Sequence, residues 1–172
     1  MAKVRQRITP CLWFDDEAEQ AARFYTGIFK NSRTTAITRY GPAGFEVHGR
    51  PAGSVMVVAF ELDGQTFTAL NGGPAFKFNE AVSLQVNCET QDEIDYYWEK
   101  LSAGGDPKAQ QCGWLKDRYG LSWQVVPADI DELFADEQSP AAQRAMEAML
   151  RMKKIDIAEL REAYEGTAAT RT

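Results

Sequence analysis

The chain has 172 residues with a formal net charge of −6 and a pI near 4.9. This acidic balance argues against nucleic acid as a partner, because a protein that binds a phosphate backbone needs a positive face. No apolar run approaches the ~20 residues of a membrane span, and no signal-peptide core follows the basic N-terminus. Three widely spaced cysteines argue against a disulfide framework, so we expect a cytoplasmic protein.

The first half of the chain predicts a βαβββ unit. Strands are expected over 7–14, 32–40, 54–62 and 65–70, with a Gly/Pro-rich loop over 41–53. A helix follows the first strand, because Ala21, Phe24, Tyr25 and Ile28 recur at helical spacing behind the N-cap candidates Asp15 and Asp16. Asp63-Gly64 predicts the hairpin turn between the last two strands.

The second half repeats this pattern at an offset of 73 residues. Ile94, Tyr97, Trp98 and Leu101 match the four apolar helix positions of the first half in register. Thr90 and Glu93 predict a capping box at the start of this helix. Strands are expected over 81–87, 110–116 and 122–126. We interpret the pattern as an internal duplication in which each curved sheet needs the other to bury its concave face.

A single domain is therefore expected, with three parts. Module one spans 7–73, module two 80–127, and a helical extension 128–166. In the extension, Ser139-Pro140 and Asp156 predict two helix starts. Met146 and Met149 belong to the apolar stripe of the first of these helices, which we expect to pack on the sheet or across a dimer.

Three segments carry a family resemblance. They are Leu70-Asn-Gly-Gly-Pro-Ala-Phe-Lys-Phe-Asn-Glu-Ala81, Trp98-Glu-Lys-Leu101, and Gln111-Cys-Gly-Trp-Leu-Lys-Asp-Arg-Tyr-Gly-Leu-Ser-Trp-Gln-Val-Val-Pro127. Together with the stretch 146–157 they resemble the PhnB-like family of the glyoxalase, bleomycin-resistance and extradiol-dioxygenase (vicinal oxygen chelate) superfamily. The resemblance implies an α+β fold of two tandem βαβββ modules, whose curved mixed sheet surrounds a cavity, with C-terminal helices and a homodimeric assembly.

Members of this family are often labelled 3-demethylubiquinone 3-methyltransferases, but the residues argue against that activity here. A common methyltransferase has a glycine-rich loop between a strand and the start of a helix. The pair Gly104-Gly105 instead follows the end of a predicted helix.

The superfamily also implies four metal-ligand positions, held by His and Glu or Gln side chains. In this sequence they correspond to Thr9, Thr68, Gln124, and either Val82 or Ser83. Hydroxyl and amide groups are weak ligands for Zn²⁺, Ni²⁺ or Fe²⁺, and the chain has a single histidine, so we expect no metal and no other cofactor.

A cavity with neutral polar groups and aromatic walls suits a small, partly apolar ligand. The expected lining residues are Thr9, Trp13, Thr68, Ser83, Trp114, Trp123 and Gln124, with Phe67 as a further wall candidate. Each aromatic residue has the alternative role of filling the core.

Three residues are candidates for catalysis without metal: Glu80 as an acid or base at the cavity mouth, Cys112 as a nucleophile, and His48 as a proton carrier in the loop. Each also has a structural alternative, as a solvated carboxylate, a buried thiol or an exposed loop residue. Three functions stay open: a metal-free small-molecule binding protein, which we favour, an enzyme that uses one of these residues, and a metal-dependent isomerase or lyase.

Overall fold

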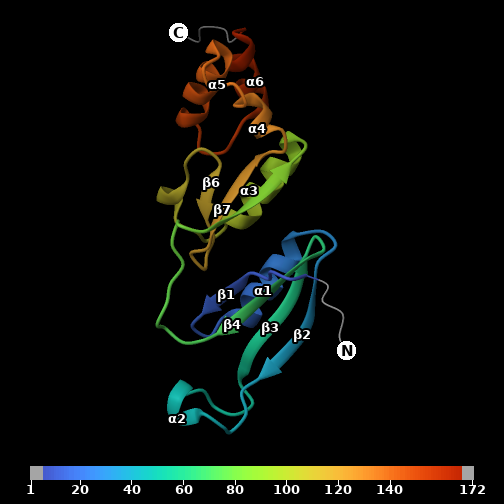
Figure 1. Ribbon diagram of the computed structural model, residues 1–172, viewed down its shortest axis with the longest axis vertical. Coiled ribbons are helices and arrows are strands. Elements are labelled where there is room, and N and C mark those ends of the chain that lie inside the picture. The colour runs from blue at the N-terminus through green and yellow to red at the C-terminus, as the bar shows by residue number, and fades with distance from the viewer. Residues whose placement is uncertain (1–5, 168–172) are drawn as a thin grey trace. The chain divides into compact units, whose positions relative to one another are not determined.

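The computed structural model describes residues 6–167, which form two compact units that meet between Lys77 and Phe78. Figure 1 shows their elements along the chain. Unit 1 contains β1 (Cys11–Phe14), α1 (Ala18–Ile28), β2 (Arg33–Arg39), α2 (Phe45–His48), β3 (Val55–Leu62) and β4 (Gln65–Asn71). Unit 2 contains β5 (Ser83–Cys88), α3 (Gln91–Ser102), a 3-10 helix (Pro107–Ala109), β6 (Trp114–Lys116), β7 (Ser122–Pro127), α4 (Ile130–Leu133), α5 (Pro140–Arg151) and α6 (Ile157–Glu165).

Unit 1 is the predicted βαβββ module. Its four strands lie in the order β1-β4-β3-β2, with β1 parallel to β4 and the other pairs antiparallel. The hairpin turn is confirmed, because Asp63 and Gly64 have the positive φ angles, 45° and 81°, that such a turn requires. The loop prediction over 41–53 is corrected in one respect, since this segment contains the short helix α2.

The cap of α1 differs from the prediction. Neither Asp15 nor Asp16 caps the helix: the N-cap residue is Glu17, and its side chain makes no cap hydrogen bond. The backbone N–H of Ala18 instead donates to Oδ1 of Asn71, at 2.8 Å, while the amide of Asn71 donates to the carbonyl of Val55. A buried side chain at the end of β4 thus ties α1 to the sheet, which a local sequence pattern does not reveal.

Unit 2 has the three strands expected along its sequence, one fewer than a complete βαβββ module. Its sheet has the order β5-β7-β6, with β5 parallel to β7 and β6 antiparallel to it. The strand expected over 110–116 is confined to Trp114–Lys116, preceded by an isolated bridge at Gln111. Residues 103–113 contain the 3-10 helix in place of a counterpart to β2. The predicted fold class is confirmed as mixed α+β, with two open sheets and C-terminal helices.

The duplication is visible in the two long helices. Ala18, the first residue of α1, and Gln91, the first of α3, differ by the predicted offset of 73. The matched pair Ala21 and Ile94 is fully buried in each unit. The cap of α3 is confirmed, since Thr90 accepts from the backbone N–H of Glu93 at 3.2 Å.

The C-terminal extension forms helices α4, α5 and α6. The predicted caps are confirmed: Ser139 accepts from the N–H of Ala142, and Asp156 from the N–H of Glu159. Helix α5 buries the small residues Ala142, Ala145 and Ala148, whereas Met146 is 37% exposed in this single chain. Packing of the methionines across a dimer stays a prediction.

The boundary between the units falls between the two predicted modules, 7–73 and 80–127. That the modules act as one domain stays a prediction. None of the helices among residues 6–167 is long and apolar enough to cross a membrane.

Candidate functional site: the helix-free faces of the two sheets

Each unit covers one face of its sheet with a helix, and several of the candidate residues lie on the other face. In unit 1, side chains alternate along the strands, and α1 covers the face that contains Leu12, Val58, Phe60 and Ala69. We call the opposite face open face 1. By the strand register it carries Cys11, Trp13, Val57, Ala59, Glu61, Thr66, Thr68 and Leu70.

Open face 1 contains a cavity of about 580 Å³. Its lining is polar and consists of Gln6, Thr9, Arg33, Thr34, Thr35, Glu61 and Thr66. Arg33 and Glu61 form an ion pair at 3.1 Å in which the carboxylate is the less exposed partner, at 20% against 68%. The amide of Gln6 joins the strand edge through hydrogen bonds with the backbone of Thr66.

The two predicted ligand positions of unit 1 lie on this face in different rows. Thr68 pairs in register with Cys11, and its N–H donates to the carbonyl of Pro10. Thr9 lies two residues before Cys11 and lines the cavity beside Thr66. The residue opposite Thr68 is therefore a cysteine, which the sequence analysis did not include.

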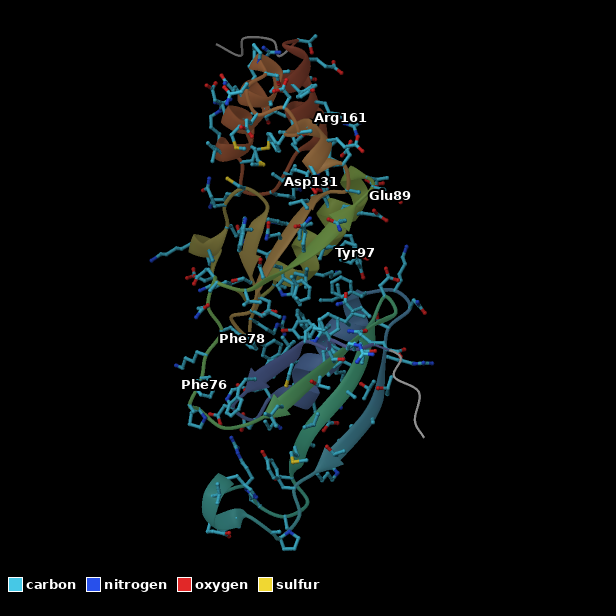
Figure 2. The ribbon with its side chains drawn as sticks, viewed as in Figure 1. Phe76, Phe78, Glu89, Tyr97, Asp131 and Arg161 are labelled. Carbon is cyan, nitrogen blue, oxygen red and sulfur yellow. The ribbon has the colours of Figure 1, made fainter. Side chains whose placement is uncertain are left out.

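Trp13 lies at the end of open face 1 beside the segment that follows β4. Its indole Nε1 donates to the carbonyl of Gly73 at 2.8 Å. Phe76, which is labelled in Figure 2, contacts the ring edge to face at 4.9 Å between centroids. The ring also occupies the space of a side chain at Gly72, because a Cβ there would lie 2.2 Å from it. Trp13 thus fixes this segment to the sheet.

In unit 2, helix α3 covers the face with Leu115, Trp123 and Val125, and we call the other face open face 2. By the register it carries Ser83, Gln85, Trp114, Lys116, Ser122 and Gln124. Of the two alternatives left open by the sequence, Val82 precedes β5 and is 68% exposed. Ser83 is the first residue of β5 and lies opposite Ser122, and the amide Nε2 of Gln124, one row along the same face, donates to the Ser83 hydroxyl at 2.9 Å.

The predicted tryptophans of unit 2 lie on opposite faces of the sheet. Trp114 is half-buried on open face 2, in register with Gln124. Trp123 is 2% exposed on the helix side, where its indole donates to Oδ2 of Asp117 at 2.8 Å. Phe67, the further wall candidate, is likewise a buried core residue at 5% exposure. Trp123 and Phe67 therefore have the core role that the sequence analysis left as their alternative.

Glu80 lies next to open face 2 and forms an ion pair with Lys116. The hydrogen bond from the Lys116 ammonium, with a smaller contribution from the Glu80 backbone, holds the pKa of Glu80 below its usual value. A carboxylate with a lowered pKa is a weaker base. The sequence analysis did not include Lys116, although its place two residues after Trp114 in a strand predicts that the two side chains share a face.

The other two catalytic candidates make local structural contacts. In His48, Nδ1 accepts from the N–H of Arg50 at 2.9 Å and Nε2 lies 3.2 Å from the carbonyl of Ala43, so the ring bridges its own loop. Cys112 occupies a turn with φ of 50°, and its N–H donates to the carbonyl of Met152. Glu80 lies in unit 2, as does Cys112, whereas His48 lies in unit 1.

The donor groups at the four ligand-like positions fit a transition metal poorly. They are the hydroxyls of Thr9, Thr68 and Ser83 and the amide of Gln124, which is already bonded to Ser83. Within residues 6–167, no three His, Cys, Asp or Glu side chains come together in a way that could hold a metal ion.

Comparison with known proteins identifies the family. The family model described as 3-demethylubiquinone-9 3-methyltransferase matches residues 6–126. A structure described as a putative 3-demethylubiquinone-9 3-methyltransferase, PhnB protein, from Bacillus cereus is 38% identical, with 72% of this chain and 100% of that chain covered and a TM-score of 0.60. The chain belongs to this family. The predicted PhnB-like resemblance is thereby confirmed.

More distant structures share the fold. PA1353 from Pseudomonas aeruginosa is 19% identical over 70% of this chain and 96% of that chain, with a TM-score of 0.52. The fosfomycin resistance protein FosX from Listeria monocytogenes, complexed with Mn(II) and sulfate, is 14% identical over 79% of this chain and 100% of that chain, with a TM-score of 0.51. No curated protein sequence matches the chain. The PhnB-like chain thus has the vicinal-oxygen-chelate fold.

Proposed function

We propose that this PhnB-like protein binds a small organic molecule on its open sheet faces without a metal ion. The observation that carries the proposal is the hydrogen bond between Gln124 and Ser83. It joins two of the four ligand-like positions directly to each other through a hydroxyl and an amide, whereas a transition-metal site needs mainly imidazole, thiolate or carboxylate ligands. Hydroxyls and amides on a half-buried face are suited to orient a neutral or anionic molecule.

Methyl transfer is not part of this proposal, despite the family description. A cofactor-dependent methyltransferase of the common type binds its nucleotide at a glycine-rich turn in a parallel sheet. The two sheets in the described part of the chain are small and mixed, and Gly104 follows the end of α3 instead of preceding a helix.

We further propose that the protein is a homodimer and is located in the cytoplasm. The homodimer rests on the family resemblance and the location on the cysteine usage. The proposal includes no nucleic-acid partner, because the chain is acidic overall.

Native mass spectrometry tests the proposal most directly, on protein purified without chelator or immobilised metal. We expect a dimer without transition metal, which retains a small organic molecule when it is purified from cells. The variant Gln124→Leu should lose that molecule, since it removes the amide and the Ser83 hydrogen bond, whereas Gln143→Leu on the exposed surface of α5 should keep it.

One transition metal per chain would overturn the metal-free part of the proposal. Cys11, which lies opposite Thr68, and Glu80 would then be the candidate metal ligands. Equal retention of the molecule by the Gln124 variant and its control would instead overturn open face 2 as part of the binding site.

The enzyme hypothesis has no comparable support from Glu80, Cys112 or His48. A lowered pKa weakens Glu80 as a base, and the ring nitrogens of His48 lie within its own loop. We therefore retain the enzyme, whether metal-free or metal-dependent, only as the alternative.

A further inference from the structure

We propose that open face 2 binds the oxyanion group of a small ligand, a carboxylate or a phosphate beside an aromatic or apolar portion. Lys116 is the cationic anchor, and Glu80 is a counterion that the ligand replaces. This inference rests on the proposed small-molecule binding and names the chemical class of the ligand.

The two members of the ion pair differ in how firmly they are held. Lys116 is in strand β6 and its side chain is 24% exposed, whereas Glu80 lies in the segment before β5 and is 65% exposed. An exposed carboxylate gains little from an ion pair, because water competes for both partners. The ammonium is therefore the fixed member, and an incoming oxyanion can take the place of the Glu80 carboxylate.

A buried hydroxyl next to Lys116 lacks a partner. Ser122 is 1% exposed and lies in register with Lys116 on one side and Ser83 on the other. Its Oγ makes no hydrogen bond within the described residues, and leaving such a group unpaired costs free energy. A hydroxyl donor beside an ammonium is suited to an oxyanion, which accepts from both.

Neighbouring side chains supply the rest of a site. The Gln124 amide, bonded to Ser83, lies in the next row of the face, and Trp114 is in register with Gln124. An indole offers a flat apolar surface for the uncharged part of a ligand. The cation, hydroxyl, amide and aromatic ring thus lie on adjacent positions of two strands.

Open face 1 has the opposite arrangement of charge, which makes the inference specific to unit 2. There the carboxylate of Glu61 is the less exposed partner, at 20%, and the guanidinium of Arg33 is 68% exposed. An oxyanion that approached Arg33 would be repelled by the half-buried carboxylate of Glu61. Of the two faces, as far as the structure describes them, only open face 2 has an ion pair in which the positive partner is the less exposed one.

The test compares benzoate, phenyl phosphate and neutral benzyl alcohol as probes, titrated into the full-length protein and followed by two-dimensional NMR. We expect at least one of the two anions to shift the signals of Trp114 and Ser122 and to bind about tenfold more tightly than benzyl alcohol, as for one well-made charged contact. A preference between benzoate and phenyl phosphate distinguishes a carboxylate ligand from a phosphate ligand.

The two partners of the ion pair should respond in opposite directions. Lys116→Met should abolish the preference for the anion, whereas Glu80→Gln should tighten anion binding about threefold by removing the competing carboxylate. A purely structural ion pair would make both changes act in the same direction. Lys116→Arg keeps the charge and should keep most of the binding if Lys116→Met fails to fold.

A second ion pair of unit 2 provides the matched control. Lys154 pairs with Asp95 of α3, and the hydrogen bond from Lys154 lowers the pKa of Asp95 as the bond from Lys116 does for Glu80. Lys154→Met and Asp95→Asn should leave binding of the anion unchanged.

Three results would contradict the inference, and they differ in what they imply. Equal binding of all three probes at open face 2 would overturn the oxyanion class while supporting small-molecule binding. If no probe shifts Thr68, Trp114 or Gln124, both the inference and the proposed binding function fail. Anion binding that persists in Lys116→Met would overturn Lys116 as the anchor.

Discussion

At the residue scale, a buried carboxylate organises the hairpin loop of unit 2. Asp117 is 2% exposed and accepts hydrogen bonds from the backbone N–H groups of Tyr119 and Leu121 and from the indole of Trp123. A buried acceptor with several donors is strongly coupled to folding, because its loss leaves those donors unpaired. The loop that Asp117 organises joins β6 to β7, the two strands that carry Lys116 and Ser122.

We predict that Asp117→Ala lowers the free energy of unfolding by about 3 kcal/mol, since hydrogen bonds to a charged group contribute about 1.5–3 kcal/mol each and partial rearrangement offsets part of the sum. Urea denaturation measures the change. The control Asp106→Ala removes an exposed carboxylate that accepts from the N–H of Lys108, and should cost less than about 1 kcal/mol. Equal losses in the two variants would contradict the role assigned to Asp117.

The cysteines provide a prediction that depends on pH. Burial, with a smaller contribution from the charge of Glu93, raises the pKa of Cys88 to about 12. The group stays a neutral thiol up to that pH, and only the thiolate reacts rapidly with an alkylating agent. At pH 8 we expect iodoacetamide to label the exposed Cys11 and to leave Cys88 unlabelled, as measured by peptide mass spectrometry.

Unfolding in urea should make Cys88 reactive, which serves as the control for the peptide detection. Labelling of Cys88 in the native protein at the rate of Cys11 would contradict its burial in unit 2.

The site residues were only partly predictable at this scale. Hydroxyl and amide residues at ligand-like positions are visible in the sequence, because the turn motif before Gln124 aligns with the superfamily pattern. The pairing of Gln124 with Ser83, and of Lys116 with Glu80, depends on strand register between segments far apart in the chain. For the same reason Trp123 and Trp114 look equivalent in the sequence, yet they lie on opposite faces.

At the element scale, the long helices are the most predictable parts of the chain. Helices α1, α3, α5 and α6 agree with the apolar periodicity expected from the sequence, and α3, α5 and α6 also have the expected caps. The predicted strand over 110–116 is longer than the observed one, because residues 107–113 form a 3-10 helix and a turn that the apolar content of this segment does not reveal. Helix α2 was missed because a single turn between glycines has too few residues to show a period.

Gln91 is one of the residues that attach the connection between α5 and α6 to α3. The amide of Gln91 donates to the carbonyl of Ile155, and its Oε1 accepts from the N–H of Ile157. Ile155 itself is fully buried. Gln91 thus joins the helical extension to the second module. The apolar periodicity of the sequence does not predict this contact, because Gln91 is polar and its partners lie more than 60 residues away.

We predict that Gln91→Ala destabilises the protein by about 1–2 kcal/mol, as for two lost hydrogen bonds that water partly replaces. The urea midpoint should fall at unchanged slope, and hydrogen exchange of the Ile157 amide should accelerate. Gln143→Ala, at an exposed position of α5, should change stability by less than about 0.5 kcal/mol. Unchanged exchange at Ile157 would contradict this attachment.

At the scale of the whole molecule, the chain divides into two compact units between Lys77 and Phe78. Residues 72–82 contain no helix or strand, and Lys77 within them is exposed. Proteases cut exposed segments with few local contacts before they cut packed helices and strands.

Limited trypsin digestion should therefore cut first after Lys77 and give fragments 1–77 and 78–172, identified by intact-mass spectrometry. Lys77→Gln should remove this first cut, while Lys100→Gln, in helix α3, should not change it. Early cleavage within α1 or α3 instead would contradict the division into two units.

The sequence by itself determined the fold class, the family and the long helices, because apolar periodicity, caps and a long local motif are encoded in neighbouring residues. It also indicated that three of the four ligand-like positions, Thr9, Thr68 and Gln124, have hydroxyl or amide groups, while the fourth stayed open between Val82 and Ser83. Only the tertiary structure decided which side chains share a face: the Asn71 contact to α1, the three-stranded second sheet, and the row that contains Ser83, Ser122 and Lys116. The physical reason is that strand register joins residues distant in the chain, and a shift of one residue moves every side chain to the opposite face.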